Sequence, residues 1–339
     1  MRPRLKPIGE QVIVVTGATS GIGLALARQA VGVGAAVVLA ARNQAALETI
    51  AGELAGSGGR VAAVVADVAN EADVTRIVAT AEQTFGGFDS WINNAAVGLY
   101  GTLEQVPVPD HRRTFEVNYF GTLYGSLLAA RHLKARGGGA IVNVGSVLGD
   151  RAIVDQGAYS ASKHAVHGLT DTLRMELERQ KAGISVTLIK PVGCATPYAE
   201  HARNYMDQPP RIPQPLYDPP IIADAILFCC ATPRRVIHIG SGGLAASLGG
   251  RLAPRFADTV MEAVGRMIQQ SPGNGGDPAM RDNLYVPRRD GEVRDTRGLR
   301  ARRTSLVVEA QKLPRPSPLA VVAGAGIALL LARVRRRPD

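Results

Sequence analysis

The chain has 339 residues, of which 46% are hydrophobic and 20% are charged, and this length is sufficient to bury a large core. The composition excludes collagen-like, low-complexity and disulfide-stapled chains. Residues 1–270 carry 25 basic and 22 acidic side chains, whereas residues 271–339 carry 14 and 7, so most of the net charge of +10 belongs to the C-terminal part. The three cysteines form no CxxC pair, and no apolar stretch of signal-peptide length precedes the first Gly-rich segment. We therefore expect a reducing, cytoplasmic location for the main domain.

The hydrophobic pattern predicts strands and helices in alternation. The predicted strands are residues 11–16, 36–40, 61–66, 88–93, 140–144, 184–189 and 236–239. The predicted helices are residues 22–33, 44–55, 71–85, 110–136 (broken near Asn118), 159–180 and 221–230. This alternation is typical of βαβ units, whose right-handed crossovers place helices on both faces of a parallel sheet. We expect an α/β, doubly wound fold, in which the Pro- and Tyr-rich residues 197–220 form a long irregular loop.

The chain changes character after residue 270. We predict a main domain over residues 1–270, a charged, Pro-containing linker over 271–316, and an apolar helix with a basic end over 317–339. The uncharged residues 319–332 would span about 21 Å as a helix, short of the ~30 Å hydrocarbon core of a bilayer. This helix either contacts a membrane through its apolar face and its arginines, or packs on the main domain or at a dimer interface.

A Gly-rich segment, Thr16-Gly17-Ala18-Thr19-Ser20-Gly21-Ile22-Gly23, follows the first strand and opens the first helix. In this position glycines allow a tight turn and close approach of a pyrophosphate, and the helix N-terminus offers unpaired N–H groups to phosphate. The alternative is a tight turn with no ligand. We expect a dinucleotide to contact Gly17, Thr19, Ser20, Gly21, Ile22 and Gly23.

The end of the second strand carries Arg42 and lacks the acidic residue that holds the ribose 2′-hydroxyl of NAD. A guanidinium there can face the 2′-phosphate of NADP, so the sequence favours NADP over NAD; the alternative is an ordinary solvated arginine. Asp67 and Val68 end the third strand, where they can contact the adenine, and Asn94 and Ala95 follow the fourth, where they can border the cofactor.

Tyr159 and Lys163 are four residues apart on a predicted helix and point to one face. Because a free tyrosine has a pKa of about 10, lowering it by about 3 units for acid–base work at neutral pH requires about 4 kcal/mol, which a neighbouring ammonium helps to supply. Ser146 lies 13 residues before Tyr159, just after a predicted strand, and its hydroxyl can hold a substrate oxygen opposite the phenol. Asn118 can interrupt its helix and bind a relay water.

Together these segments resemble the short-chain dehydrogenase/reductase family. The resemblance covers residues 8–270 and is carried by TGATSGIG at 16–23, NNAA at 93–96, Asn118, Ser146, YSASK at 159–163 and PVGCAT at 191–196. It implies a single doubly wound Rossmann domain with a parallel sheet of about seven strands, and the C-terminal extension lies outside the family pattern. The family usually has Gly where this chain has Ala96.

By resemblance, Tyr159 is the general acid–base, Ser146 orients the carbonyl, Lys163 binds the nicotinamide ribose and lowers the pKa of Tyr159, and Asn118 supports a proton relay. The positions expected beside the nicotinamide are Pro191, Gly193 and Thr196. The resemblance also implies a homo-oligomer.

The sequence therefore predicts an NADP(H)-dependent oxidoreductase that interconverts a small-molecule carbonyl and alcohol. A membrane-contacting tail would favour lipophilic substrates. The alternative is a non-catalytic NADP-binding redox sensor or scaffold. The sequence has no HExxH motif, so we expect no catalytic metal, and it has no pattern of a nucleic-acid-binding fold, so we expect no nucleic-acid partner. Four residues of the 197–220 loop either line the substrate pocket or belong to a lid without direct contact: Tyr198, Tyr205, Met206 and Tyr217.

Overall fold

The computed structural model describes residues 3–242, 249–250, 252–273 and 275–313. The chain divides into two units, Met1–Val308 and Glu309–Asp339. The first unit holds the sheet and the cavity described below. Of the second unit the structure describes residues 309–313, where Lys312 pairs with Glu309 at 3.0 Å. The helix predicted over residues 317–339 lies outside the described residues.

The core of the first unit is a seven-stranded sheet in the order β10-β7-β6-β4-β1-β2-β3, with every neighbouring pair parallel. Its strands are β1 (Val12–Thr16), β2 (Ala36–Ala41), β3 (Val61–Val65), β4 (Ser90–Asn93), β6 (Gly139–Val144), β7 (Ile184–Pro191) and β10 (Val236–Ile239). Two short pairs lie outside this sheet: β5 (Leu99–Tyr100) with β8 (Arg203–Asn204), and β9 (Leu216–Tyr217) with β11 (Ala301–Arg302). This sheet confirms the predicted doubly wound α/β fold.

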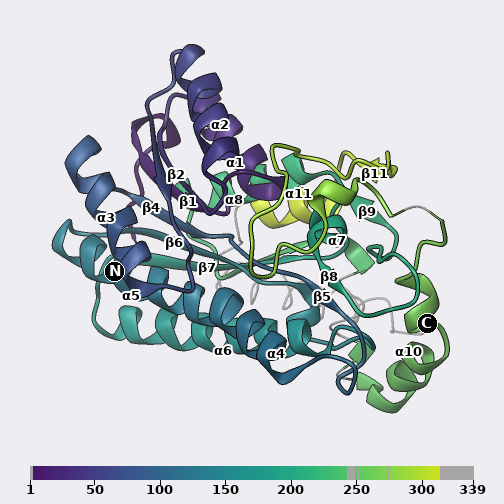
Figure 1. The fold of residues 1–339 in the computed structure, drawn as a ribbon. Helices are drawn as coiled ribbons and strands as arrows, with labels where there is room; N and C mark the ends of the chain where they lie inside the picture. The colour runs from purple at the N-terminus through teal and green to yellow at the C-terminus, as the bar shows by residue number, and fades with distance from the viewer. Residues whose placement is uncertain (1–2, 243–248, 251, 274, 314–339) are drawn as a thin grey trace, which may run out of the picture. The chain divides into compact units, whose positions relative to one another are not determined.

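The helices are α1 (Gly21–Gly32), α2 (Gln44–Gly56), α3 (Glu71–Phe85), α4 (Val108–Phe115), α5 (Gly121–Ala135), α6 (Gly157–Arg179), α7 (Tyr198–His201), α8 (Pro219–Ala231), α10 (Pro254–Ile268) and α11 (Leu306–Lys312). Figure 1 shows α1 and α2 on one side of the strands and α5 and α6 on the other. Each side has its own apolar core, one with side chains of α1, α2 and α8 and the other with those of α3, α5 and α6. Successive strand residues serve opposite cores: Ile13 and Val15 face the first, and Val14 faces the second.

The break predicted near Asn118 is a π-helical turn at Glu116–Phe120, which separates α4 from α5. Such a turn widens the helix and marks functional positions in many proteins. The segment predicted as an irregular loop, residues 197–220, contains the short elements α7, β8 and β9.

The largest difference from the sequence prediction concerns residues 271–308, here called the extension. These residues belong to the same compact unit as the sheet, and Leu284, Asp295 and Val308 are buried. Their charges and prolines predicted an extended or poorly ordered linker, because local composition does not reveal which charges pair. Asp295 and Arg297 form an ion pair whose side chains are 1% and 2% exposed, so the charge here belongs to the folded interior.

Among the described residues, no helix combines the length and the apolar character required to cross a bilayer.

Candidate active site

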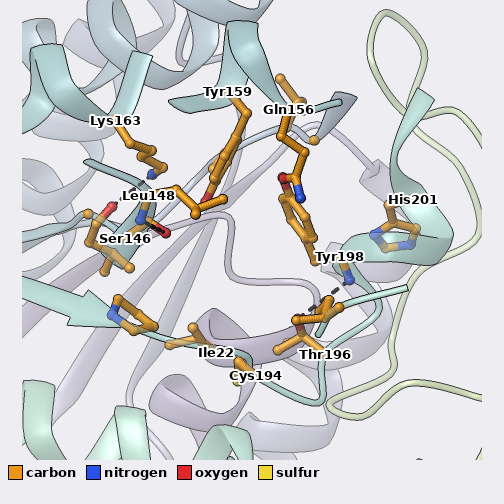
Figure 2. Close-up of a pocket in the computed structure, with 18 of the residues that line it drawn as sticks. Ile22, Ser146, Leu148, Gln156, Tyr159, Lys163, Cys194, Thr196, Tyr198 and His201 are labelled. Carbon is orange, nitrogen blue, oxygen red and sulfur yellow. Dashed lines mark hydrogen bonds between the residues drawn. The ribbon is translucent and has the colours of Figure 1, made fainter. Parts of the chain in front are cut away.

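A cavity of about 650 Å³ lies across the carboxyl ends of the central strands, where open α/β sheets bind their ligands. One end is lined by the Gly-rich turn after β1 and by Arg42, and the other by Ser146, Tyr159 and Lys163. The extension and α10 contribute further wall residues. Figure 2 shows the second end, with Tyr159 and Ser146 pointing toward the same part of the pocket.

The Gly-rich turn is held tightly against the segment that follows β4. Gly17 has a φ of +65°, and a Cβ there would lie 2.8 Å from Ala95 Cα. Asn94 Nδ2 donates to the carbonyl oxygens of Thr16 and Gly17 at 3.0 and 3.1 Å. A Cβ on Gly23 would lie 2.1 Å from the oxygen of Gly17. The glycines are therefore needed for this close packing, which aims the start of α1 at the cavity.

The residues expected at the adenosine end also meet in the cavity, with an unforeseen partner. Arg42, Asp67 and Val68 line it together with Asn94 and Ala95. The Asp67 carboxylate accepts a hydrogen bond of 2.5 Å from Arg113 of α4. Arg113 was not singled out in the sequence, because only the tertiary fold brings α4 to the end of β3.

The general acid–base candidate Tyr159 lies on α6, and burial raises the pKa of its phenol to about 12, with hydrogen bonding from Ser146 and Tyr198 opposing the shift. Burial lowers the pKa of Lys163 to about 8. The Lys163 ammonium lies 5.7 Å from the centre of the Tyr159 ring and donates to the carbonyl of Val144 at 2.9 Å. Thus the pKa of Tyr159 is raised rather than lowered as expected, since desolvation outweighs its polar partners.

Ser146 follows β6, where its hydroxyl accepts a hydrogen bond from the N–H of Leu148 at 3.1 Å. This bond fixes the hydroxyl beside the phenol of Tyr159. Tyr198 packs edge-on against Tyr159 with ring centres 5.3 Å apart, and its hydroxyl donates to Gln156 at 3.3 Å. Gly98 leaves space for this ring, since a Cβ there would lie 2.7 Å from it.

Two of the predicted residues are not in the cavity wall. Gly23 packs against Gly17 as described, and Asn118 is fully buried below the wall. Asn118 Oδ1 accepts from the N–H of Val97 at 2.9 Å, and its Nδ2 donates to Ser162 of α6 at 3.0 Å. Asn118 therefore braces the helix that carries Tyr159, and its side chain does not reach the cavity to hold a relay water.

The loop after β7 brings Pro191, Gly193 and Thr196 to the cavity, as expected. Of the four residues weighed for the substrate pocket, Tyr198 lines the cavity. The other three lie elsewhere: Tyr205 donates to Asp110 at 2.6 Å, Tyr217 is part of the first apolar core, and Met206 packs in a small cluster with Tyr100.

The residues of the cavity fit a dinucleotide, because one continuous space connects the Gly-rich turn with Tyr159 and Lys163, and its volume is typical of cofactor sites. Ser20, Ile22 and Thr196 border this path between the two ends. At the phosphate end, however, several donors already have partners in the extension.

A family model described as short chain dehydrogenase matches residues 11–207. An uncharacterized oxidoreductase of Bacillus subtilis, YxnA, is 48% identical over 263 residues, which cover 77% of this chain and 74% of the relative. Uncharacterized oxidoreductases of Staphylococcus aureus are 36% identical over 227 residues, covering 67% of this chain and 94% of theirs.

Solved structures show the same likeness. A short-chain dehydrogenase/reductase of Burkholderia phymatum in complex with NAD is 27% identical with a TM-score of 0.65, covering 80% of this chain and 99% of that one. L-Sorbose reductase of Gluconobacter frateurii, complexed with NADPH and L-sorbose, is 25% identical with a TM-score of 0.60, covering 70% and 97%. The neighbours thus include both an NAD and an NADPH complex.

Proposed function

Because the chain belongs to the short-chain dehydrogenase family and is an NAD(P)-dependent oxidoreductase, we propose that it interconverts a carbonyl and an alcohol with Tyr159 as the general acid–base. The observation that carries this proposal is the convergence of Ser146, Tyr159 and Lys163 at one end of a cavity whose other end is the Gly-rich turn. The three side chains come from two elements, β6 with its following turn and α6.

In the proposed reaction each of the three side chains has one role. The Ser146 hydroxyl, fixed by the Leu148 N–H, holds the substrate oxygen. The Tyr159 phenol donates its proton to that oxygen during reduction and takes it back during oxidation. The Lys163 ammonium, four residues along the same helix, favours the phenolate that remains. A nicotinamide bound in this cavity supplies or accepts the hydride.

We propose NADP(H) as the cofactor, with NAD(H) as the alternative. The support is the guanidinium of Arg42 at the end of β2, in a cavity wall that presents no acidic side chain from β2 itself. Asp67 follows the neighbouring strand β3, but Arg113 already pairs with its carboxylate. A bidentate cation at this position suits a phosphate better than a hydroxyl.

We propose that the substrate is lipophilic. The cavity wall includes apolar side chains from three segments, among the polar side chains of Arg151, Gln156 and Gln214: Leu148, Ile153, Ile212, Phe256, Val260 and Met261. Phe256 and Val260 of α10 are 71% and 36% exposed, so the apolar wall continues to the surface. A wall of this kind stabilises a hydrocarbon substituent on the carbonyl.

The test is the Tyr159→Phe variant, measured on a panel of ketones and aldehydes with NADPH and NADH. We expect the wild type to turn over at least one carbonyl and to bind NADPH more tightly than NADH. The variant should lose at least about 100-fold in kcat, because a positioned acid–base contributes on the order of 10²–10⁴-fold, and should still bind the cofactor. The control is Tyr124→Phe, which makes the same change in a tyrosine that packs against the second apolar core.

Undiminished turnover by Tyr159→Phe would contradict the mechanism. A wild type that binds NADPH but turns over no carbonyl or alcohol of the panel would instead favour the redox sensor or scaffold. Two further parts of the proposal, a homo-oligomer and membrane contact through residues 317–339, stay predictions.

A further inference from the structure

Ten residues of the extension, 283–292, pass along the phosphate end of the cavity, and we call them the strap. The strap meets the Gly-rich turn through three hydrogen bonds. The Thr19 hydroxyl donates to the Asp290 carboxylate at 2.5 Å, the N–H of Gly21 donates to the carbonyl of Glu292 at 2.9 Å, and the N–H of Gly291 donates to the carbonyl of Thr19 at 3.0 Å. The hydroxyl of Thr19 and the first N–H of α1 are donors of the kind that a pyrophosphate takes.

The strap also engages Arg42. The guanidinium donates to the carbonyl oxygens of Asn283, Leu284 and Tyr285 at 2.5, 3.3 and 3.3 Å. Neighbouring Asn43 donates to the carbonyl of Arg288 at 2.7 Å. Three uncharged oxygens therefore stand where the proposed function places a doubly charged phosphate.

One strap contact is incomplete. The second carboxylate oxygen of Asp290, Oδ1, is buried and accepts no hydrogen bond from any residue that the structure describes. His201 Nε2 lies 3.9 Å away, and that nitrogen also contacts the carbonyl of Arg289 at 3.2 Å. A buried anionic oxygen without a hydrogen-bond partner weakens the state that contains it, which lowers the free-energy cost of releasing Asp290 from Thr19.

We propose that the strap is an internal occupant of the phosphate end of the dinucleotide groove, with Asp290 and the carbonyls of 283–285 as its ligand groups. The proposal rests on the proposed function. A dinucleotide and the docked strap need the same donors, and the carboxylate of Asp290 repels a phosphate placed beside it. Cofactor binding therefore releases Asp290 from Thr19, and the extension sets the affinity of the enzyme for its cofactor.

The first test is the affinity of Asp290→Ala for NADPH and NADH, measured by calorimetry on the full chain. Removing the charged competitor is expected to tighten NADPH binding by about tenfold, the factor that corresponds to one hydrogen bond to a charged group. Glu262→Ala removes the same charge from the exposed face of α10, where Glu262 pairs with Arg255, and should change affinity less than twofold. Unchanged or weaker binding by Asp290→Ala would overturn the proposal.

The second test is amide hydrogen exchange of the wild type with and without NADPH. Competition predicts faster exchange at Gly291, whose N–H is bonded to Thr19 in the docked strap. Slower exchange throughout 283–292 would show that the strap clamps a bound cofactor, which contradicts the proposal. If neither dinucleotide binds to the folded wild type or to folded Asp290→Ala, the proposed function itself is wrong. If a dinucleotide binds to the wild type and to Asp290→Ala with equal affinity, only the proposal for the strap is wrong.

Discussion

Lys163 is a buried amine whose charge opposes folding. Its folded pKa is about 8, below the usual 10.5, so between pH 8 and 10.5 the unfolded chain holds a proton that the folded chain has lost. The free energy of unfolding therefore increases, and the folded state becomes more stable, as the pH rises through this window. Tyr159 behaves in the opposite way, because its folded pKa of about 12 removes stability between pH 10 and 12.

This linkage predicts the behaviour of Lys163→Met, which replaces the amine by an apolar side chain of similar length. Between pH 7 and pH 10 the unfolding free energy of the wild type should rise relative to that of the variant by on the order of 2–3 kcal/mol, which is about two pKa units. Urea unfolding at the two pH values measures it. Lys134→Met, an exposed site on α5, should show no such difference; a pH-independent gap for Lys163→Met would show that the amine is not titrating in the fold.

At the same scale, the sequence predicts side chains that local geometry positions. Tyr159 and Lys163 share a helix face at i and i+4, so their meeting in one cavity wall could be foreseen. Arg113 could not be assigned in this way, because its partner Asp67 lies 46 residues away along the chain. The position of Asn118 at the helix break was predicted, but the hydrogen-bond partners of its side chain were not. Its side chain is hydrogen-bonded to Val97 and Ser162.

At the scale of elements, α10 provides a test of the lipophilic substrate. Val260 lines the cavity, whereas its neighbour Thr259 does not and is exposed. A carboxylate at 260 should repel a hydrocarbon chain, so Val260→Asp should raise KM at least tenfold for long methyl ketones and leave short ones within twofold. The matched variant Thr259→Asp puts the same charge on the same helix and should leave both unchanged.

The measurement is KM across a homologous series. In the wild type each added methylene should lower KM about threefold to fourfold while it remains in contact with the wall, as ~0.8 kcal/mol per buried CH₂ requires. The proposal of an apolar substrate wall is wrong if the wild-type KM does not depend on chain length. It is also wrong if Val260→Asp raises KM equally for short and long ketones.

The elements of the sheet were predictable because each has a strong hydrophobic period of its own. Glu71–Phe85 and Val236–Ile239 have the predicted ends, and Asn70 caps α3 by accepting from the N–H of Ala72. The extension has no such period. Its structure depends on contacts with distant segments, such as Asn283 N–H to the carbonyl of His201 and Asp295 N–H to that of Ala195, which no local pattern encodes.

At the scale of the whole molecule, those contacts make the extension a structural part of the catalytic unit. Arg297 donates to Asp295 and, at 2.8 Å, to the carbonyl of Pro210. Thr296 N–H donates to Glu200 of α7 at 2.8 Å. Folding of the sheet domain and docking of the extension are therefore expected to be one cooperative transition, although the strap within the extension exchanges its contacts.

Arg297→Ala tests this cooperativity, because it leaves the Asp295 carboxylate buried without its partner. Breaking a buried pair from one side is expected to lower the free energy of unfolding by about 3–5 kcal/mol. Arg289→Ala removes an arginine that is 63% exposed and pairs with Asp277, and it should change stability by less than about 1 kcal/mol. Denaturant unfolding followed by the fluorescence of Trp91, which is fully buried in the second core, reports on the sheet rather than on the extension. If Trp91 fluorescence and total secondary structure report the same decrease in the free energy of unfolding, the sheet and the extension unfold in one transition. If the Trp91 midpoint does not change, the extension folds separately, and the strap is then a tethered ligand.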